Sequence, residues 1–125
     1  GGLEAYSKLL TMVGNLPDVD FAEVHALGDR LNRSNNEEAY WVWVDLLRLW
    51  LSRVARGGAA PGSWTEVTSG EGELARRLTI NVGLDHWVGL WEKIGSLAMR
   101  AERVNLDRKQ VVINAFMALQ STARQ

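Results

Sequence analysis

Apolar side chains recur every three or four residues along most of this 125-residue chain, which is the spacing of amphipathic helices. The first run stops at Gly14, shortly before Pro17. A second run follows Asp20, an N-cap candidate whose capping box Glu23 completes. Two short helices are therefore predicted before residue 32. Their expected core stripes are Tyr6, Leu9, Leu10 and Val13 in the first, and Phe21, Val24, Leu27 and Leu31 in the second.

The strongest periodic run covers residues 37–56 and predicts a third helix with a wide apolar side. Ser34 or Asn35 signals its start, since each is followed three residues later by a glutamate. So wide an apolar arc needs several covering neighbours, and we expect this helix to be central. The residues expected in its core are Tyr40, Trp43, Val44, Leu47, Trp50, Leu51 and Val54, with Ala39 and Leu46 beside them.

A short hinge formed by Asn105, Leu106 and Asp107 is predicted to join the last two helices. Asp107 can cap the final helix, and Gln110 lies where it can complete a capping box. Leu106 is also spaced to form a hydrophobic staple with Val111. So short a connection makes the two helices neighbours, in an antiparallel hairpin.

The remaining segments complete an all-α bundle of five or six helices in one domain over residues 1–125. Residues 57–72 hold five of the twelve glycines and are predicted to form a flexible loop, which contains Trp64. A short fourth helix around residues 74–78 is expected to fade at 81–83. Asp85 is the predicted N-cap of the fifth helix, and the sixth is expected over 108–121. The apolar face predicted for the fifth is Trp87, Leu90, Trp91, Ile94, Leu97, Ala98, Ala101 and Val104.

Composition sets the chain among ordinary globular proteins, with 46% hydrophobic and 23% charged residues. A formal net charge of −1 provides no general attraction to nucleic acid or to an anionic membrane. The absence of cysteine excludes disulfide and thiolate chemistry. No apolar run is long enough for a membrane span, so a cytoplasmic location is the default expectation. The start at Gly1, without a methionine, favours a piece of a longer protein.

Patterns for catalysis, cofactor binding or metal binding are not found in the sequence. None of the three lysines follows a glycine-rich phosphate loop. The two histidines, His25 and His86, fall on different predicted helices, and His25 with Asp29 one turn away is expected to be a surface pair. We therefore predict a non-catalytic chain that holds neither a cofactor nor a metal.

Clustered arginines leave nucleic-acid contact as an alternative, because arginine and tryptophan together can bind phosphates and stack on bases. Acidic residues near each cluster favour solvated helix faces instead, and direct nucleic-acid contact is not expected. The clusters are Arg30 with Arg33, Arg53 with Arg56, and Arg76 with Arg77.

Partner binding is the more informative hypothesis, because several apolar residues exceed what one core face needs. Trp41 falls among polar residues of the third helix, and Ile113 with Met117 lies one turn apart, away from the predicted core stripe of Val112, Ala115, Phe116 and Leu119. Val88 and Met99 form a weaker stripe on the fifth helix, and Trp64 is a further weak candidate. The alternative is that another part of the same domain covers these residues.

Several motifs carry a resemblance to one family. They are Leu90-Trp91-Glu92-Lys93-Ile94, the run from Arg100 through the hinge to Val112, the opening Gly2-Leu3-Glu4-Ala5-Tyr6, and Asp45-Leu46-Leu47. Together they resemble the C-terminal region of delta-prime subunits of the bacterial DNA polymerase III clamp loader, particularly alphaproteobacterial forms. The resemblance spans most of the chain and is weakest over residues 57–72.

The resemblance implies a helical collar domain, preceded in the full protein by two AAA+ modules, and assigns no catalytic residue to this chain. Such a collar packs with the collars of the delta and tau/gamma subunits in the pentamer that loads the sliding clamp during DNA replication. Trp41, Ile113 and Met117 are the residues expected at that interface. A DNA-contacting or regulatory helical module of unrelated origin stays open as the alternative.

Overall fold

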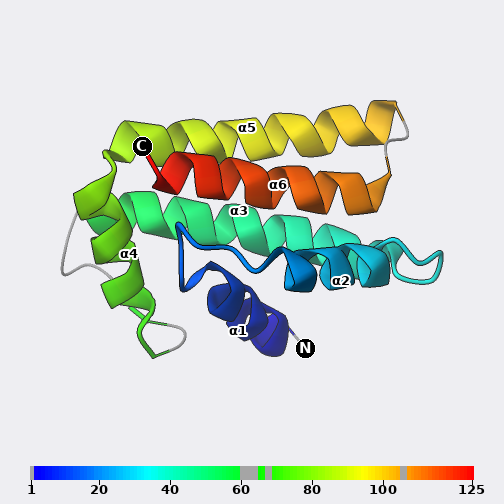
Figure 1. The fold of residues 1–125 in the computed structure, drawn as a ribbon, viewed down its shortest axis with the longest axis horizontal. Helices are drawn as coiled ribbons and strands as arrows, with labels where there is room; N and C mark the ends of the chain where they lie inside the picture. The colour runs from blue at the N-terminus through cyan, green and yellow to red at the C-terminus, as the bar shows by residue number, and fades with distance from the viewer. Residues whose placement is uncertain (1, 60–64, 67–68, 105–106) are drawn as a thin grey trace.

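The computed structural model describes residues 2–59, 65–66, 69–104 and 107–125, and within these ranges the chain forms six helices and no strand. The predicted all-α bundle is therefore confirmed (Figure 1). The helices are α1 (Gly2–Val13), α2 (Phe21–Leu31), α3 (Glu37–Ala59), α4 (Glu71–Asn81), α5 (Leu84–Arg103) and α6 (Arg108–Ala123).

The central position predicted for α3 is confirmed, since this helix contacts α1, α2, α4 and α5. All seven residues predicted in its core are buried, and Leu46 is partly buried, but Ala39 is exposed. The predicted cap was wrong. The carbonyl of Asn36 accepts the first helical hydrogen bond, from the Tyr40 amide at 3.0 Å, which makes Asn36 the N-cap residue.

The two hairpin helices α5 and α6 lie side by side, and α6 also packs against α2 (Figure 1). At the start of α2, the Asp20 carboxylate accepts from the amides of Ala22 and Glu23, so this predicted N-cap is confirmed. Gly28 of α2 lets α2 and α6 approach closely, because a Cβ at this position would lie 2.8 Å from Cγ of Lys109 on α6.

The predicted loop over residues 57–72 was too long at both ends, because α3 continues to Ala59 and α4 begins at Glu71. Glycine lowers helix stability by about 1 kcal/mol per residue, and a long packed helix tolerates that cost in its last turn. At the other end, Gly70 adopts a left-handed φ of 87°, and α4 follows directly. The short fourth helix itself is confirmed.

The predicted start of α5 was wrong by two residues, because an Asp85 N-cap implies a helix from residue 86, whereas the helix begins at Leu84 and Asp85 lies within its first turn. Gly83 is the N-cap and makes no side-chain hydrogen bond, so Asp85 contributes as a negative charge near the helix N-terminus. Five predicted face residues are buried, Leu97 is partly buried, and two predictions were wrong, since Trp91 is 37% exposed and Val104 is 67% exposed.

Candidate partner interface

The start of α6 positions the two strongest interface candidates. The Asp107 carboxylate accepts from the Lys109 amide at 3.0 Å, which confirms the predicted N-cap. Gln110 does not complete a capping box, because its side-chain amide donates to Asn114 Oδ1 at 2.9 Å instead. Asp29 on α2 pairs with Lys109 at 2.7 Å, which fixes the first turn of α6 against α2.

The solvent side of α6 carries no charge between Lys109 and Arg124. We define the α6 outer face as Gln110, Ile113, Asn114, Met117 and Ser121. Met117 is 54% exposed, whereas Ile113 is half-buried and packs against the core. Charge depletion around an exposed apolar side chain is typical of the centre of a protein interface.

Trp41 lies in a second region, at the junction of α3 with the hairpin. It is half-buried, with its ring edge-on to Tyr40 at a centroid distance of 5.0 Å. Both aromatic residues border a groove of about 440 Å³ whose other walls include Ala101, Glu102 and Arg108. Burial raises the pKa of Tyr40, and the nearby Arg108 guanidinium opposes that rise.

Arg108 braces this junction by donating from Nη2 to the carbonyl oxygens of Asn32 at 3.3 Å and Arg33 at 2.8 Å. Its guanidinium also lies 5.8 Å from the Tyr40 ring centroid. The end of α2, the start of α3 and the start of α6 are therefore held together beside Trp41.

The weaker stripe of Val88 and Met99 flanks the seam between α3 and α5. Both residues are exposed, by 42% and 68%. Within the seam, the Arg48 guanidinium lies 4.3 Å from the Trp91 ring centroid and crosses Gly95, where a Cβ would lie 2.8 Å from Nη2. Trp91, which was predicted to be buried, is 37% exposed and makes a cation–π contact with this guanidinium.

The structure therefore places the interface candidates on two surfaces. Trp41 borders the α3–α5 side of the bundle, together with the seam that Val88 and Met99 flank. Ile113 and Met117 lie on α6, which packs between α2 and α5 and turns its core stripe inward. Trp64, Asn105 and Leu106 lie outside the described residues.

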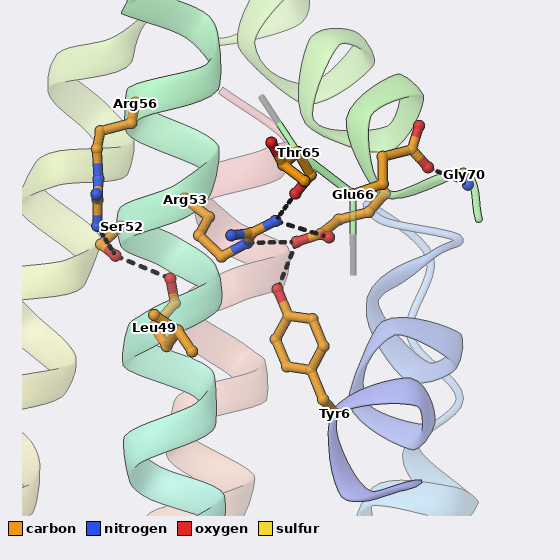
Figure 2. A network of polar contacts seen from close by, with 9 residues as sticks. Tyr6, Leu49, Ser52, Arg53, Arg56, Thr65, Glu66 and Gly70 are labelled. Carbon is orange, nitrogen blue, oxygen red and sulfur yellow. Dashed lines mark hydrogen bonds and ion pairs between the residues drawn. The ribbon is translucent and has the colours of Figure 1, made fainter. Parts of the chain in front are cut away.

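A buried polar network that the sequence did not predict joins α1, α3 and α4 (Figure 2). The Glu71 carboxylate at the start of α4 is 1% exposed. It accepts from the Tyr6 hydroxyl of α1 and from Arg53 of α3, whose Nε lies at 2.7 Å and Nη2 at 3.0 Å. Arg53 Nη2 also donates to the Thr65 carbonyl at 2.6 Å.

Burial and the hydrogen bond to Glu71 raise the pKa of Tyr6 well above its ordinary value. The bond to the same carboxylate raises the pKa of Arg53 and keeps the guanidinium charged. The network is thus a charged pair shielded by a neutral tyrosine. Tyr6 and Glu71 are 65 residues apart, so no local pattern could have revealed it.

Two members of the arginine clusters are committed to intramolecular bonds. Arg53 belongs to the Glu71 network, and Arg77 donates to the carbonyl oxygens of Leu16 and Gly14, both at 2.8 Å. These guanidinium groups support the fold, which leaves less of the predicted basic surface for phosphate contacts.

The described residues carry no cluster of metal-ligating side chains. No group of three or more His, Cys, Asp or Glu side chains among them is placed to hold a metal ion. His25 and Asp29 both lie on the surface, as predicted, and Asp29 pairs with Lys109, whose hydrogen bond lowers the pKa of Asp29. Within the described ranges, no helix combines the length and apolar character that a membrane crossing needs.

Comparison with known proteins adds no relative. No protein-family model matches the chain, and neither a curated protein nor a solved structure matches it significantly.

Proposed function

We propose that this chain is a non-catalytic assembly domain, the collar of a delta-prime-like subunit of the bacterial DNA polymerase III clamp loader. The single observation that carries the assembly role is the α6 outer face, which exposes Met117 on a helix surface without charges. A solvated helix face ordinarily carries charged residues, and a protein interface loses them at its centre.

The particular complex is proposed from the sequence resemblance, whose motifs lie mainly on α5 and α6. A collar needs apolar surface beyond its own core, because it must bury faces against adjacent subunits. The exposed Met99 and the half-buried Trp41 supply such surface on the α3–α5 side as well. The domain would then act by holding its parent subunit in the pentamer.

The test replaces Ile113 and Met117 with aspartate and measures capture of the tau/gamma and delta subunits by the chain. We expect capture to fall strongly, since two buried charges would enter an apolar contact. The matched control is Ile80→Asp, because Ile80 is 74% exposed on α4, outside the proposed surfaces.

Circular dichroism and urea unfolding separate an interface effect from a folding effect. Met117→Asp alone should leave the fold intact, because Met117 is more than half exposed. If the double variant unfolds while Met117→Asp folds and still captures the subunits, the α6 outer face is not the interface. No capture by the unmodified chain would refute the clamp-loader assignment.

A DNA-contacting module is the competing function. Salt-sensitive binding of the chain to duplex or primed DNA would favour it, because phosphate contacts weaken steeply with ionic strength. The bonds that occupy Arg53 and Arg77 favour the assembly role instead.

A further inference from the structure

The side of α5 that faces away from α3 carries cations and no acid. Trp91 and Gly95 mark the α3 side, because the Arg48 guanidinium of α3 lies against both. At 3.6 residues per turn, Lys93 and Arg100 share a side of α5 that lies roughly opposite those two residues. Both cations are exposed.

Neither Lys93 nor Arg100 has an acidic residue one turn away on α5. Among the residues that the structure describes, neither side chain forms an ion pair. The helix dipole favours a cation in the last turns of α5, but it gives no role to Lys93 at the middle of the helix. The positions three and four residues away are Gly89, Leu90, Ser96 and Leu97 for Lys93, and Ser96, Leu97, Arg103 and Val104 for Arg100.

The α6 outer face continues this surface across the seam between α5 and α6, which lie side by side (Figure 1). No acidic residue occurs from Arg108 to Gln125, and the exposed Arg124 follows Met117 by two turns on the same side. On the α2 side, the Asp29 carboxylate is already paired with Lys109 at 2.7 Å. We define the α5–α6 surface as the α6 outer face together with Lys93, Ser96, Arg100 and Arg124.

The α5–α6 surface has the layout of a protein interface. Its centre is uncharged and holds the exposed Met117 and the half-buried Ile113, while its cations lie along the α5 edge and at the end of α6. Protein interfaces place apolar residues at the centre and polar or charged residues at the rim. A rim of one sign selects a partner of the opposite sign, because like charges across an interface repel. An amphipathic helix whose apolar stripe is bordered by carboxylates has the required chemistry.

Nucleic acid fits the α5–α6 surface less well. Binding of single strands uses aromatic side chains on which bases stack, and this surface contains none. Binding of duplex DNA depends on many lysine and arginine contacts to phosphate groups. The surface offers Lys93, Arg100 and Arg124 around an uncharged strip, which favours a protein partner.

We propose that the α5–α6 surface binds an acidic amphipathic helix of a protein partner. The apolar stripe of that helix packs on Met117, and its carboxylates pair with Lys93 and Arg100 along one edge and with Arg124 at the end. This inference deepens the proposed function and rests on it, because it names the chemistry of the subunit surface that covers the α6 outer face.

Charge reversal on α5 tests the inference in the capture assay. Lys93→Glu combined with Arg100→Glu should reduce capture of the tau/gamma or delta subunits by about tenfold or more, since two attractive pairs become repulsive. The matched control is Lys8→Glu combined with Arg76→Glu, which changes the net charge equally at exposed positions of α1 and α4. Ser96→Lys adds a cation between Lys93 and Arg100 and should strengthen capture.

Two synthetic helical peptides test the class of partner directly. Both carry leucines at helical spacing, flanked by glutamates in one peptide and by lysines in the other. We expect the unmodified chain to bind the glutamate peptide at least about tenfold more tightly, and to lose affinity as NaCl screens the charge pairs. Binding should shift the methyl NMR resonance of Met117. The charge reversal on α5 should weaken this binding, and its matched control should not.

Three outcomes overturn the inference: a glutamate peptide that binds no better than the lysine peptide, a matched control that weakens binding as much as the charge reversal, or tighter binding of duplex or primed DNA than of the glutamate peptide. Circular dichroism of each variant excludes loss of fold as the cause.

The failure of the inference can be told apart from the failure of the proposed function. If the variant with aspartate at Ile113 and Met117 loses capture while the charge reversal on α5 keeps it, the inference fails and the assembly role stands. If the unmodified chain captures neither subunit, the clamp-loader assignment fails, and the peptide comparison alone decides whether the α5–α6 surface takes an acidic helix.

Discussion

Replacement of Glu71 by glutamine tests whether the buried network fastens α4 to the rest of the bundle. The substitution keeps the shape of the side chain and removes its charge. Glu71 is 1% exposed and accepts from Tyr6 and from Arg53. The variant removes the carboxylate charge that faces the Arg53 guanidinium and places an amide donor at one of the two oxygen positions, while the remaining oxygen can still accept.

The expected loss follows from the burial of the pair. Removal of one partner from a buried ion pair costs about 3–5 kcal/mol when the other charge cannot reach water. The Arg53 side chain is 22% exposed, so solvent recovers part of that cost. We therefore expect Glu71→Gln to lower the free energy of unfolding by about 2–4 kcal/mol, a large share of the 5–15 kcal/mol typical of a domain.

Urea unfolding of a double-mutant cycle measures the coupling directly. Tyr6→Phe removes one hydrogen bond to a charged group and should cost about 1.5–3 kcal/mol. In the Tyr6→Phe background, Glu71→Gln should cost less than in the unmodified chain, because the shared bond is already absent. Met99→Gln is the control, since Met99 is 68% exposed and should give no measurable change.

The pH dependence of stability gives a second readout. The folded state raises the pKa of Tyr6 above the value of 10.0 that an unperturbed tyrosine has. The unfolded chain therefore releases this proton first, and stability is lost as the pH rises above 10. Tyr6→Phe should flatten that alkaline decline. The network would be refuted if the free-energy costs of Tyr6→Phe and Glu71→Gln were additive. It would also be refuted if Tyr6→Phe lost stability above pH 10 as steeply as the unmodified chain.

Three other predictions test single contacts. Gly95→Ala should change the free energy of unfolding little in the unmodified chain, because the new methyl group must displace the Arg48 guanidinium. In an Arg48→Ala background the same substitution should stabilise the fold by about 1 kcal/mol, since alanine then contributes its higher helix propensity without that clash. Urea unfolding of both backgrounds checks this, and equal gains would contradict it. Carboxyl NMR should place the Asp29 pKa below 3.8, and Lys109→Met should raise it, since that partner lowers it. The Asp29 contribution is present above pH 3.8 and is lost as the pH falls through the lowered pKa. Asp107→Ala should cost about 1 kcal/mol through loss of the N-cap, and a change within error would show that the α6 cap is dispensable.

Periodicity predicted the inside of α3 well, because the positions nearest the centre of an apolar arc are buried whatever the neighbours are. Leu47, Trp50 and Leu51 are each fully buried, as the spacing indicated. Positions at the edge of an arc depend on the adjacent helix. Ala39 is exposed because it lines an open groove between α1, α2 and α3. Trp91 lies at the edge of its arc and contacts the Arg48 guanidinium, and none of the described helices covers the rest of its ring, so it is 37% exposed.

Long-range polar contacts lay beyond sequence reasoning. Glu71 follows Gly70 in a run that reads as a loop, and nothing near it indicates burial. The buried Glu71 carboxylate is stabilised by its ion pair with Arg53, a residue that the sequence analysis placed in a surface cluster. A groove of about 830 Å³ between α1, α2 and α3 was missed for a related reason, since a groove depends on the angle between helices and not on the apolar stripe of any one helix.

The exposed methionines allow the proposed assembly role to be tested separately from folding. Two of its three methionines, Met99 and Met117, are more than half exposed, so neither contributes much to the core. Methionine is adaptable and recurs at binding surfaces. The two lie on different surfaces, one beside the α3–α5 seam and one on the α6 outer face. A member of a ring of subunits touches two neighbours, so two such surfaces are what the proposed collar role requires. Loss of assembly in Met117→Asp with full stability would then locate one neighbour, and the same result in Met99→Asp would locate the other.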